Sequence, residues 1–229
     1  IVREPEMLES IFFNLVREYD LSQDRWPTIQ EFVGGRKLGV LGVYRHGKHV
    51  SSIVFKIERS KGAANFGTST YRVTIDDPIT QGNAIKAMEA LNWHGVVDMD
   101  WLRDADGTAQ LIDINGRLGG ATALTLISEM DMPWVWYQIA TESDPIEVPL
   151  PQVDAKARWI LGDFLGMIDS FRKGQYAEAR RVLHPARGCR HDDWVCQDPL
   201  PFFFQWLDYG VKFFRAGGKM NPVSDGMIR

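Results

Sequence analysis

One segment constrains the chain more than any other, because it combines two alternating strands with a set of acidic and amide side chains. Residues 95–120 read GVVDMDWLRDADGTAQLIDINGRLGG. Successive side chains of a strand point to opposite faces. Asp98 and Asp100 therefore share one face of the first strand, and Asp113 and Asn115 share one face of the second.

The length of the turn between these strands decides which side chains face each other. If the Asp-Gly pair at 106–107 is a two-residue type I′ loop, Asp100 is paired with Asp113 and Asp98 with Asn115. A four-residue loop would pair Asp98 with Asp113 and keep these residues on one face. Only an odd loop length would separate the acids.

Opposed carboxylates on neighbouring strands indicate a metal site. Directly opposed residues in antiparallel strands have Cβ atoms about 4.5–5.5 Å apart, and like charges there destabilise the pair. Mg²⁺ would offset this repulsion, since it prefers oxygen ligands and is usually bound by one or two carboxylates plus substrate phosphates. Arg117 can neutralise phosphate charge, and Gly119-Gly120 allows backbone N–H groups to approach an anion.

Two motifs together resemble the ATP-grasp superfamily, over about residues 28–142. Asp100 followed by 113–117 (DINGR) is similar to the family's pattern of an acid, a turn and an acid-hydrophobic-Asn-x-Arg sequence. Residues 30–35 (QEFVGG) resemble the family's linker strand, which borders the adenine and ribose. Asp stands where the family more often has Glu, and Gly116 stands where Pro is common.

The resemblance implies a role for each matching residue. Asp100, Asp113 and Asn115 would ligate Mg²⁺ (or Mn²⁺), and Arg117 would contact phosphate or an acyl-phosphate intermediate as the catalytic residue. The residues that it implies near the ATP are Gln30, Glu31, Phe32, Val33, Lys56 and Arg59.

The activity implied by the resemblance is that of a carboxylate–amine ligase. ATP would activate a carboxylate as an acyl phosphate, which an amine or similar nucleophile then attacks. The family's lysine-bearing lobe and Gly-rich flap are not found, so we expect the enzyme to need residues that precede Ile1, in cis or in trans. Two alternatives stay open: a non-catalytic ATP-grasp-like module for regulation or assembly, and a metal-binding recognition domain.

Periodicity along the chain predicts an α+β fold with an antiparallel sheet, flanking helices and a mainly helical tail. Residues 1–142 form the C-terminal part of an ATP-grasp domain in this prediction. Residues 143–151 (SDPIEVPLP) form a proline-rich connector, and residues 152–229 form the helical tail. Thr28–Val33 is expected to be a short strand.

Composition limits the partners and the location. The formal net charge is −4, which does not favour a nucleic-acid-binding protein, and no apolar run approaches the roughly 20 residues that cross a bilayer. The two cysteines cannot form a disulfide framework. We therefore expect a cytoplasmic protein without nucleic-acid or membrane partners. The ATP-grasp resemblance implies small-molecule carboxylate and amine substrates, and a homodimer is one expected form.

Overall fold

The computed structural model describes residues 2–62, 67–141, 148–183 and 187–215. The chain forms two compact units, residues 1–34 and 35–229, which are described separately. In the first unit, helix α1 (Leu8–Glu18) lies between the 3₁₀ turns η1 (Pro5–Met7) and η2 (Gln23–Arg25). The predicted strand at 28–33 is wrong: this stretch has no regular secondary structure, because none of the described strands pairs with it.

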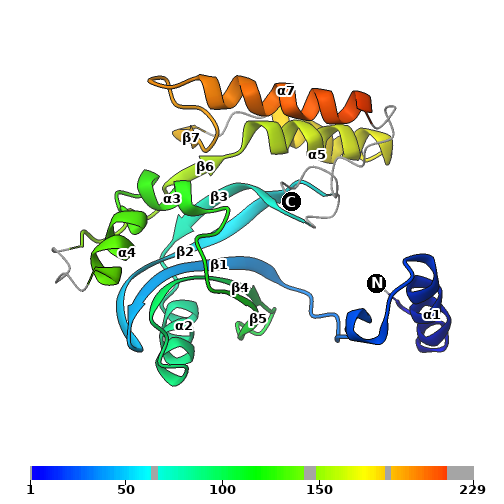
Figure 1. The fold of residues 1–229 in the computed structure, drawn as a ribbon, viewed down its shortest axis with the longest axis horizontal. Helices are drawn as coiled ribbons and strands as arrows, with labels where there is room; N and C mark the ends of the chain where they lie inside the picture. Colours follow the sequence, from blue (N-terminus) through cyan, green and yellow to red (C-terminus); the bar gives the residue numbers. More distant parts are fainter. Residues whose placement is uncertain (1, 63–66, 142–147, 184–186, 216–229) are drawn as a thin grey trace. The chain divides into compact units, whose positions relative to one another are not determined.

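The second unit is built on a seven-stranded sheet with the order β5-β4-β1-β2-β3-β6-β7 (Figure 1). Every neighbouring pair is antiparallel except β6 and β7, which are parallel. The predicted α+β fold is therefore confirmed. The strands are β1 (Arg36–Arg45), β2 (Lys48–Ser60), β3 (Ser69–Ile75), β4 (Gly95–Arg103), β5 (Ala109–Asn115), β6 (Lys156–Arg158) and β7 (Cys189–His191).

The region after residue 152 differs from the prediction in one respect. It contributes the short strands β6 and β7 to the edge of the sheet, in addition to the helices α5 (Ile160–Arg172), α6 (Tyr176–Leu183) and α7 (Leu200–Arg215). Three-residue strands carry too little alternation to be recognised in a sequence. The predicted connector at 143–151 lies partly outside the described residues, and the division of the chain at that point stays a prediction.

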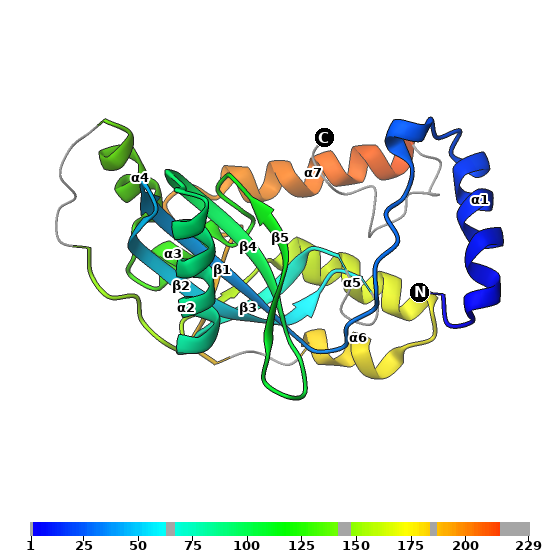
Figure 2. The same cartoon turned by 90° about the horizontal axis from the view of Figure 1, so that it is seen from below.

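Helices cover both faces of the sheet. Helix α2 (Pro78–Ala90) lies across one face, as Figure 2 shows from below. It packs on a core that includes Leu38, Val40 and Trp101. The opposite face is covered by α3 (Thr122–Ile127) and α4 (Met132–Ala140), and its core includes Leu41, Val43 and Phe55. We call these the α2 face and the α3/α4 face.

The alternation of β1 produces this division directly. Leu38 and Val40 pack on the α2 face, whereas Leu41 and Val43 pack on the α3/α4 face. The hairpin to β2 turns through His46 and Gly47, both with positive φ (48° and 77°), as a type I′ turn requires. Within the described residues, no helix is long and apolar enough to cross a membrane.

Candidate functional site

Strands β4 and β5 bring the predicted carboxylates face to face. Asp100 is opposite Asp113, and Asp98 is opposite Asn115. This is the pairing predicted for a two-residue loop. The loop itself is longer than two residues. The Asp104 backbone N–H donates to the Thr108 carbonyl (3.1 Å), so the strands are paired up to these two residues and three residues remain between them.

A β-bulge corrects for the odd loop length. Residues 105–107 form a three-residue loop in which Gly107 has a φ of 84°, as in three-residue hairpins that end in a left-handed residue. That loop pairs Trp101 with Leu111, and the register then shifts before Asp100 pairs with Asp113. Ile112 is thus the extra residue of the bulge. One odd loop and one bulge together return the acids to a common face.

The common face is the α3/α4 face. Asp98 is opposite Leu41 of β1, and Asp100 is opposite Gly39. Lys37 lies two residues before Gly39 in the same strand, so its side chain is on this face too. Sequence analysis missed Lys37, because nothing local predicts that β1 lies beside β4.

The side chains of β5 hold one another in place. The Asn115 amide Nδ2 donates to Asp113 Oδ2 (2.9 Å), and the Arg117 guanidinium donates to Asn115 Oδ1 (3.4 Å). Asp113 Oδ1 accepts the Ile114 backbone N–H (2.9 Å). Asp113 and Asn115 of β5, together with Arg117 just after the strand, therefore form one hydrogen-bonded row of side chains.

The glycine-rich bend after Arg117 closes over Asp98. A Cβ added at Gly119 would overlap the Asp98 carboxylate, whereas no described heavy atom lies within 4 Å of a Cβ added at Gly120. The bend thus acts as a cover for this carboxylate. The anion site expected at the N-terminus of the next helix stays a prediction. That helix, α3, has only six residues, so few peptide dipoles add up at its N-terminus.

The two glycines provide a matched test of this cover. Gly119→Ala is expected to displace the bend or the Asp98 side chain, and so to lower the free energy of unfolding by about 1–3 kcal/mol, the range for overpacking. Gly120→Ala is expected to change it by less than about 0.5 kcal/mol. Denaturant unfolding of both variants checks this. Equal losses in the two variants would contradict the close contact at Gly119.

Burial and like charges raise the pKa values of the β4 carboxylates. The pKa of Asp98 is raised to about 6, first by burial and then by the charge of Asp100, while Arg117 and Arg72 act in the opposite direction. The pKa of Asp100 is also raised, by burial and by the facing Asp113. Burial lowers the pKa of Lys37, and Asp100 opposes that shift. Shifted acids in one place are typical of functional sites.

Arg72 of β3 is a second residue that sequence analysis missed. Its side chain is only 2% exposed, and it is opposite Ile57, which packs on the α3/α4 face. The guanidinium donates to the Gly120 carbonyl and forms an ion pair with Asp192. Arg72 therefore ties the glycine-rich bend to the segment after β7. A pocket of about 590 Å³ adjoins this bridge, and Trp159 and Val195 line it.

Lys56 and Arg59 are not brought to the carboxylates. Lys56 is opposite Leu38, on the α2 face, and its Nζ lies 2.5 Å from Glu58 Oε1. Arg59 forms an ion pair with Asp163 of α5 (2.7 Å).

Four further predicted residues belong to the first unit. Gln30, Glu31 and Phe32 line an apolar groove against α1, and Val33 follows them in the chain. Their predicted contact with a nucleotide stays a prediction.

The side-chain oxygens of Asp100, Asp113 and Asn115 fit Mg²⁺ only if phosphate oxygens or water supply its remaining ligands. No group of three or more His, Cys, Asp or Glu side chains in the described part of the chain is arranged to hold a metal ion. Mg²⁺ sites in phosphoryl-transfer enzymes need fewer protein ligands, because phosphate oxygens and water complete the octahedron. Two opposed carboxylates and an amide oxygen match that requirement.

Solved structures share this fold, although no family model and no curated protein sequence matches the chain. The biotin carboxylase of Campylobacter jejuni, solved as a β,γ-ATP complex, superposes with a TM-score of 0.51 at 17% identity, over 64% of this chain and 35% of its own. The pyruvate carboxylase of Rhizobium etli gives 0.51 at 17% identity, over 66% of this chain and 14% of its own. The ATP-grasp resemblance is therefore confirmed at the level of the fold, and the chain spans about a third or less of these proteins.

Proposed function

We propose that this chain, which has the fold of the C-terminal ATP-grasp lobe, forms half of the site of an ATP- and Mg²⁺-dependent carboxylate–amine ligase. The observation that carries the proposal is the arrangement of Asp100, Asp113 and Asn115 on one face, with Arg117 beside them. The other half of the nucleotide site would come from residues outside the chain, in cis or in trans.

In this proposal Asp100, Asp113 and Asn115 hold the metal ion, Mg²⁺ or Mn²⁺. The ion neutralises charge on the phosphate oxygens when it is bound. Without it, the charge of Asp113 disfavours ionisation of Asp100, whose pKa is raised first by burial and then by that facing charge. A bound metal ion would offset the repulsion between the carboxylates of Asp100 and Asp113. The proposal therefore gives a reason for a pair that destabilises the folded chain when no ion is bound.

Positive charge on the same face would orient the phosphates. Arg117 is held by Asn115, so its guanidinium lies next to the proposed metal ligands. Lys37 is partly buried near Asp100, and a partly desolvated cation attracts phosphate more strongly than one in water. We assign Arg117 the catalytic role, because it would stabilise charge that develops during phosphoryl transfer.

The chemistry needs positioning rather than a nucleophilic side chain. A carboxylate oxygen of the substrate attacks the γ-phosphorus of ATP, and the bond to ADP breaks. An amine then attacks the carbonyl carbon of the acyl phosphate, inorganic phosphate leaves, and the amine loses a proton. The pocket beside Arg72 and Gly120 adjoins this face, and we assign it to the small-molecule substrate.

Hydroxylamine trapping tests the proposal in the full-length protein. With ATP, Mg²⁺ and a panel of carboxylic acids, hydroxylamine should give a hydroxamate together with ADP. Formation of AMP and pyrophosphate instead would contradict an acyl phosphate, because it would indicate an acyl adenylate. Absence of any ATP cleavage with every acid, in protein that is folded and binds Mg-ATP, would favour the non-catalytic module.

A further inference from the structure

Helix α7 has two apolar faces, and the described residues of its own unit cover only one of them. The inner face packs on α5: Tyr209 is buried against Leu161 and Leu165, and Trp206 packs beside them. A helix at the surface of a globular protein normally needs one such face. The opposite face of α7 therefore calls for a separate explanation.

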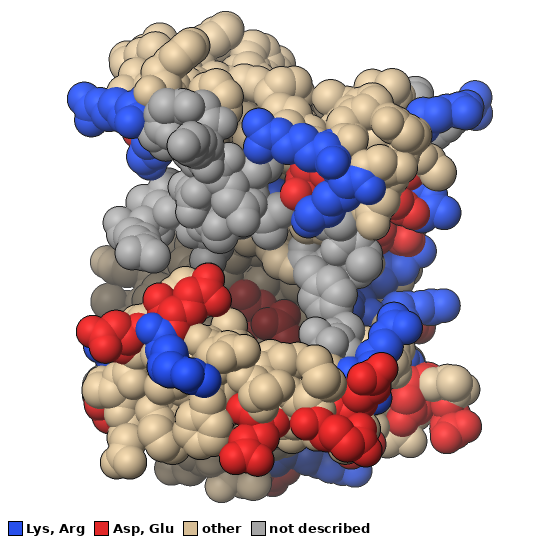
Figure 3. Space-filling view, turned by 90° about the vertical axis from the view of Figure 1, so that its right-hand side faces the viewer, with Lys and Arg blue, Asp and Glu red and all other residues tan. Residues whose placement is uncertain are grey.

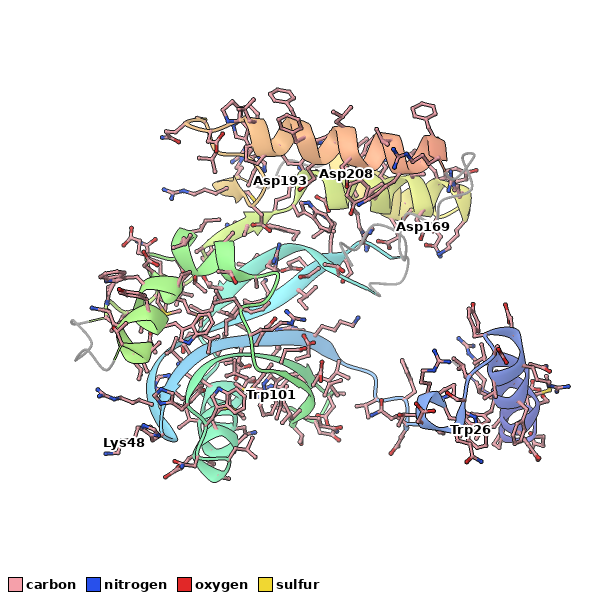
Figure 4. The ribbon with its side chains drawn as sticks, viewed as in Figure 1. Trp26, Lys48, Trp101, Asp169, Asp193 and Asp208 are labelled. Atoms are coloured by element: carbon pink, nitrogen blue, oxygen red, sulfur yellow. The ribbon has the colours of Figure 1, made fainter. Side chains whose placement is uncertain are left out.

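The outer face is a continuous stripe of exposed apolar residues, which we call the α7 stripe. Its members are exposed by 39% to 79%, and they recur at the three- and four-residue spacing of one helix face. Figure 4 shows side chains projecting from α7 away from α5. The top edge of Figure 3, where α7 lies, carries few charged side chains. The α7 stripe consists of Leu200, Phe203, Phe204, Leu207, Val211 and Phe214.

The α7 stripe is symmetric about Leu207. Leu200 and Phe214 lie seven residues to either side of Leu207, and Phe203 and Val211 lie four residues to either side. The stripe therefore coincides with itself when the helix is turned end for end. An isologous interface has this property, since the same surface must match itself across a two-fold axis.

Phe204 is the one member of the α7 stripe without an apolar counterpart on the other side of Leu207, and it also fits a self-complementary surface. The position that mirrors Phe204 about Leu207 is Gly210, and no described heavy atom lies within 4 Å of a Cβ added there. The glycine leaves a gap beside the stripe that an aromatic ring of a second helix can fill. Large side chains next to small ones are how helix surfaces interlock.

Charge favours the antiparallel arrangement over the parallel one. Lys212 and Arg215 stand in the last turn of α7, and the first turn has no acidic residue. Parallel packing would place the two basic ends, and the two ends of the helix dipoles, side by side. Antiparallel packing separates the basic ends and aligns the dipoles favourably.

We propose that the α7 stripe is the interface for a second copy of this chain, with α7 packed antiparallel on its symmetry mate and the two-fold axis at Leu207. This inference does not depend on the proposed ligase activity. A helix of 16 residues is about 24 Å long, so the interface is at the small end of specific ones. We therefore expect a dimer that dissociates in the micromolar range.

Sedimentation equilibrium of the full chain from about 1 to 200 µM tests the interface. The average mass should rise toward twice the monomer mass with concentration. Leu207→Glu should hold it at the monomer mass, because two carboxylates would meet at the axis. Leu183→Glu, at a residue of α6 that is 69% exposed, is the matched control and should still dimerise. A monomeric wild type, or a Leu207→Glu variant that dimerises like the control, would overturn the proposal.

Cysteine cross-linking tests the antiparallel geometry separately. In a background of Cys189→Ser and Cys196→Ser, Leu207→Cys should form a disulfide with its own copy under mild oxidation. Phe203→Cys should not, because eight residues separate positions 203 and 211 along the helix, about 12 Å. A mixture of Phe203→Cys and Val211→Cys should give the mixed dimer. Efficient self-linking of Phe203→Cys would indicate parallel packing and contradict the proposal.

Discussion

Replacing both Asp100 and Asp113 by Asn is expected to lower the rate of ADP formation by about 10³-fold or more, while the fold is kept. Loss of one well-placed electrostatic contact to a transition state costs about 10²–10³-fold, and this double change removes both carboxylates that face each other across β4 and β5. The free energy of unfolding should not fall, because the substitution removes a like-charge pair. Steady-state kinetics and thermal unfolding of the same preparations measure both effects.

The hairpin that carries these residues offers a matched control. Asp106 lies in the loop of the same hairpin, is exposed, and is not among the opposed side chains. Asp106→Asn should leave the rate of ADP formation within about twofold of the wild type. A double variant that keeps wild-type activity, or a control that loses as much, would contradict the assignment of the metal ligands.

Replacing Asp98 by Asn is expected to stabilise the folded chain near neutral pH. The folded pKa of Asp98 is raised from 3.8 to about 6, so the folded state holds this proton more tightly than the unfolded state. Well below pH 3.8 the carboxyl is protonated in both states, and its burial then costs no stability through ionisation. As the pH rises from about 4 to above 6, stability is lost. Two pKa units correspond to about 3 kcal/mol.

The Asn variant should therefore gain about 2–3 kcal/mol in the free energy of unfolding at pH 7.5, and little at pH 4. Denaturant unfolding at the two pH values, without added metal or nucleotide, measures this difference. Asp106→Asn should show no such dependence on pH. A gain of equal size at both pH values, or a loss at pH 7.5, would mean that burial of the Asp98 charge is not what raises its pKa.

Local patterns were sufficient to predict the hairpin and its acidic face. The alternation of residues 95–103 and 108–115 identifies both strands, and the spacing of Asp98 and Asp100 fixes their common face. The predicted pairing of Asp100 with Asp113 is correct, but the two-residue turn on which the prediction rested is not what produces it. A three-residue loop and the bulge at Ile112 cancel, and no local signal in the sequence distinguishes that combination from an even loop.

Contacts between distant segments could not be predicted in the same way. Lys37 and Arg72 reach the site only because β1 lies beside β4 and because β3 faces the glycine-rich bend. Lys56 follows the right alternation for a strand, but its place on the α2 face depends on the register with β1. Residue type and spacing define a strand's two faces, whereas the packing of helices decides which face holds the site.

The affinity for ATP, measured by calorimetry with and without Mg²⁺, tests the central claim most directly. In the full-length protein, Mg²⁺ should increase ATP affinity at least about tenfold. Asp113→Asn should abolish that increase and Asp106→Asn should preserve it. If Asp113→Asn responds to Mg²⁺ as the wild type does, the carboxylates of β4 and β5 do not share a metal ion with the nucleotide.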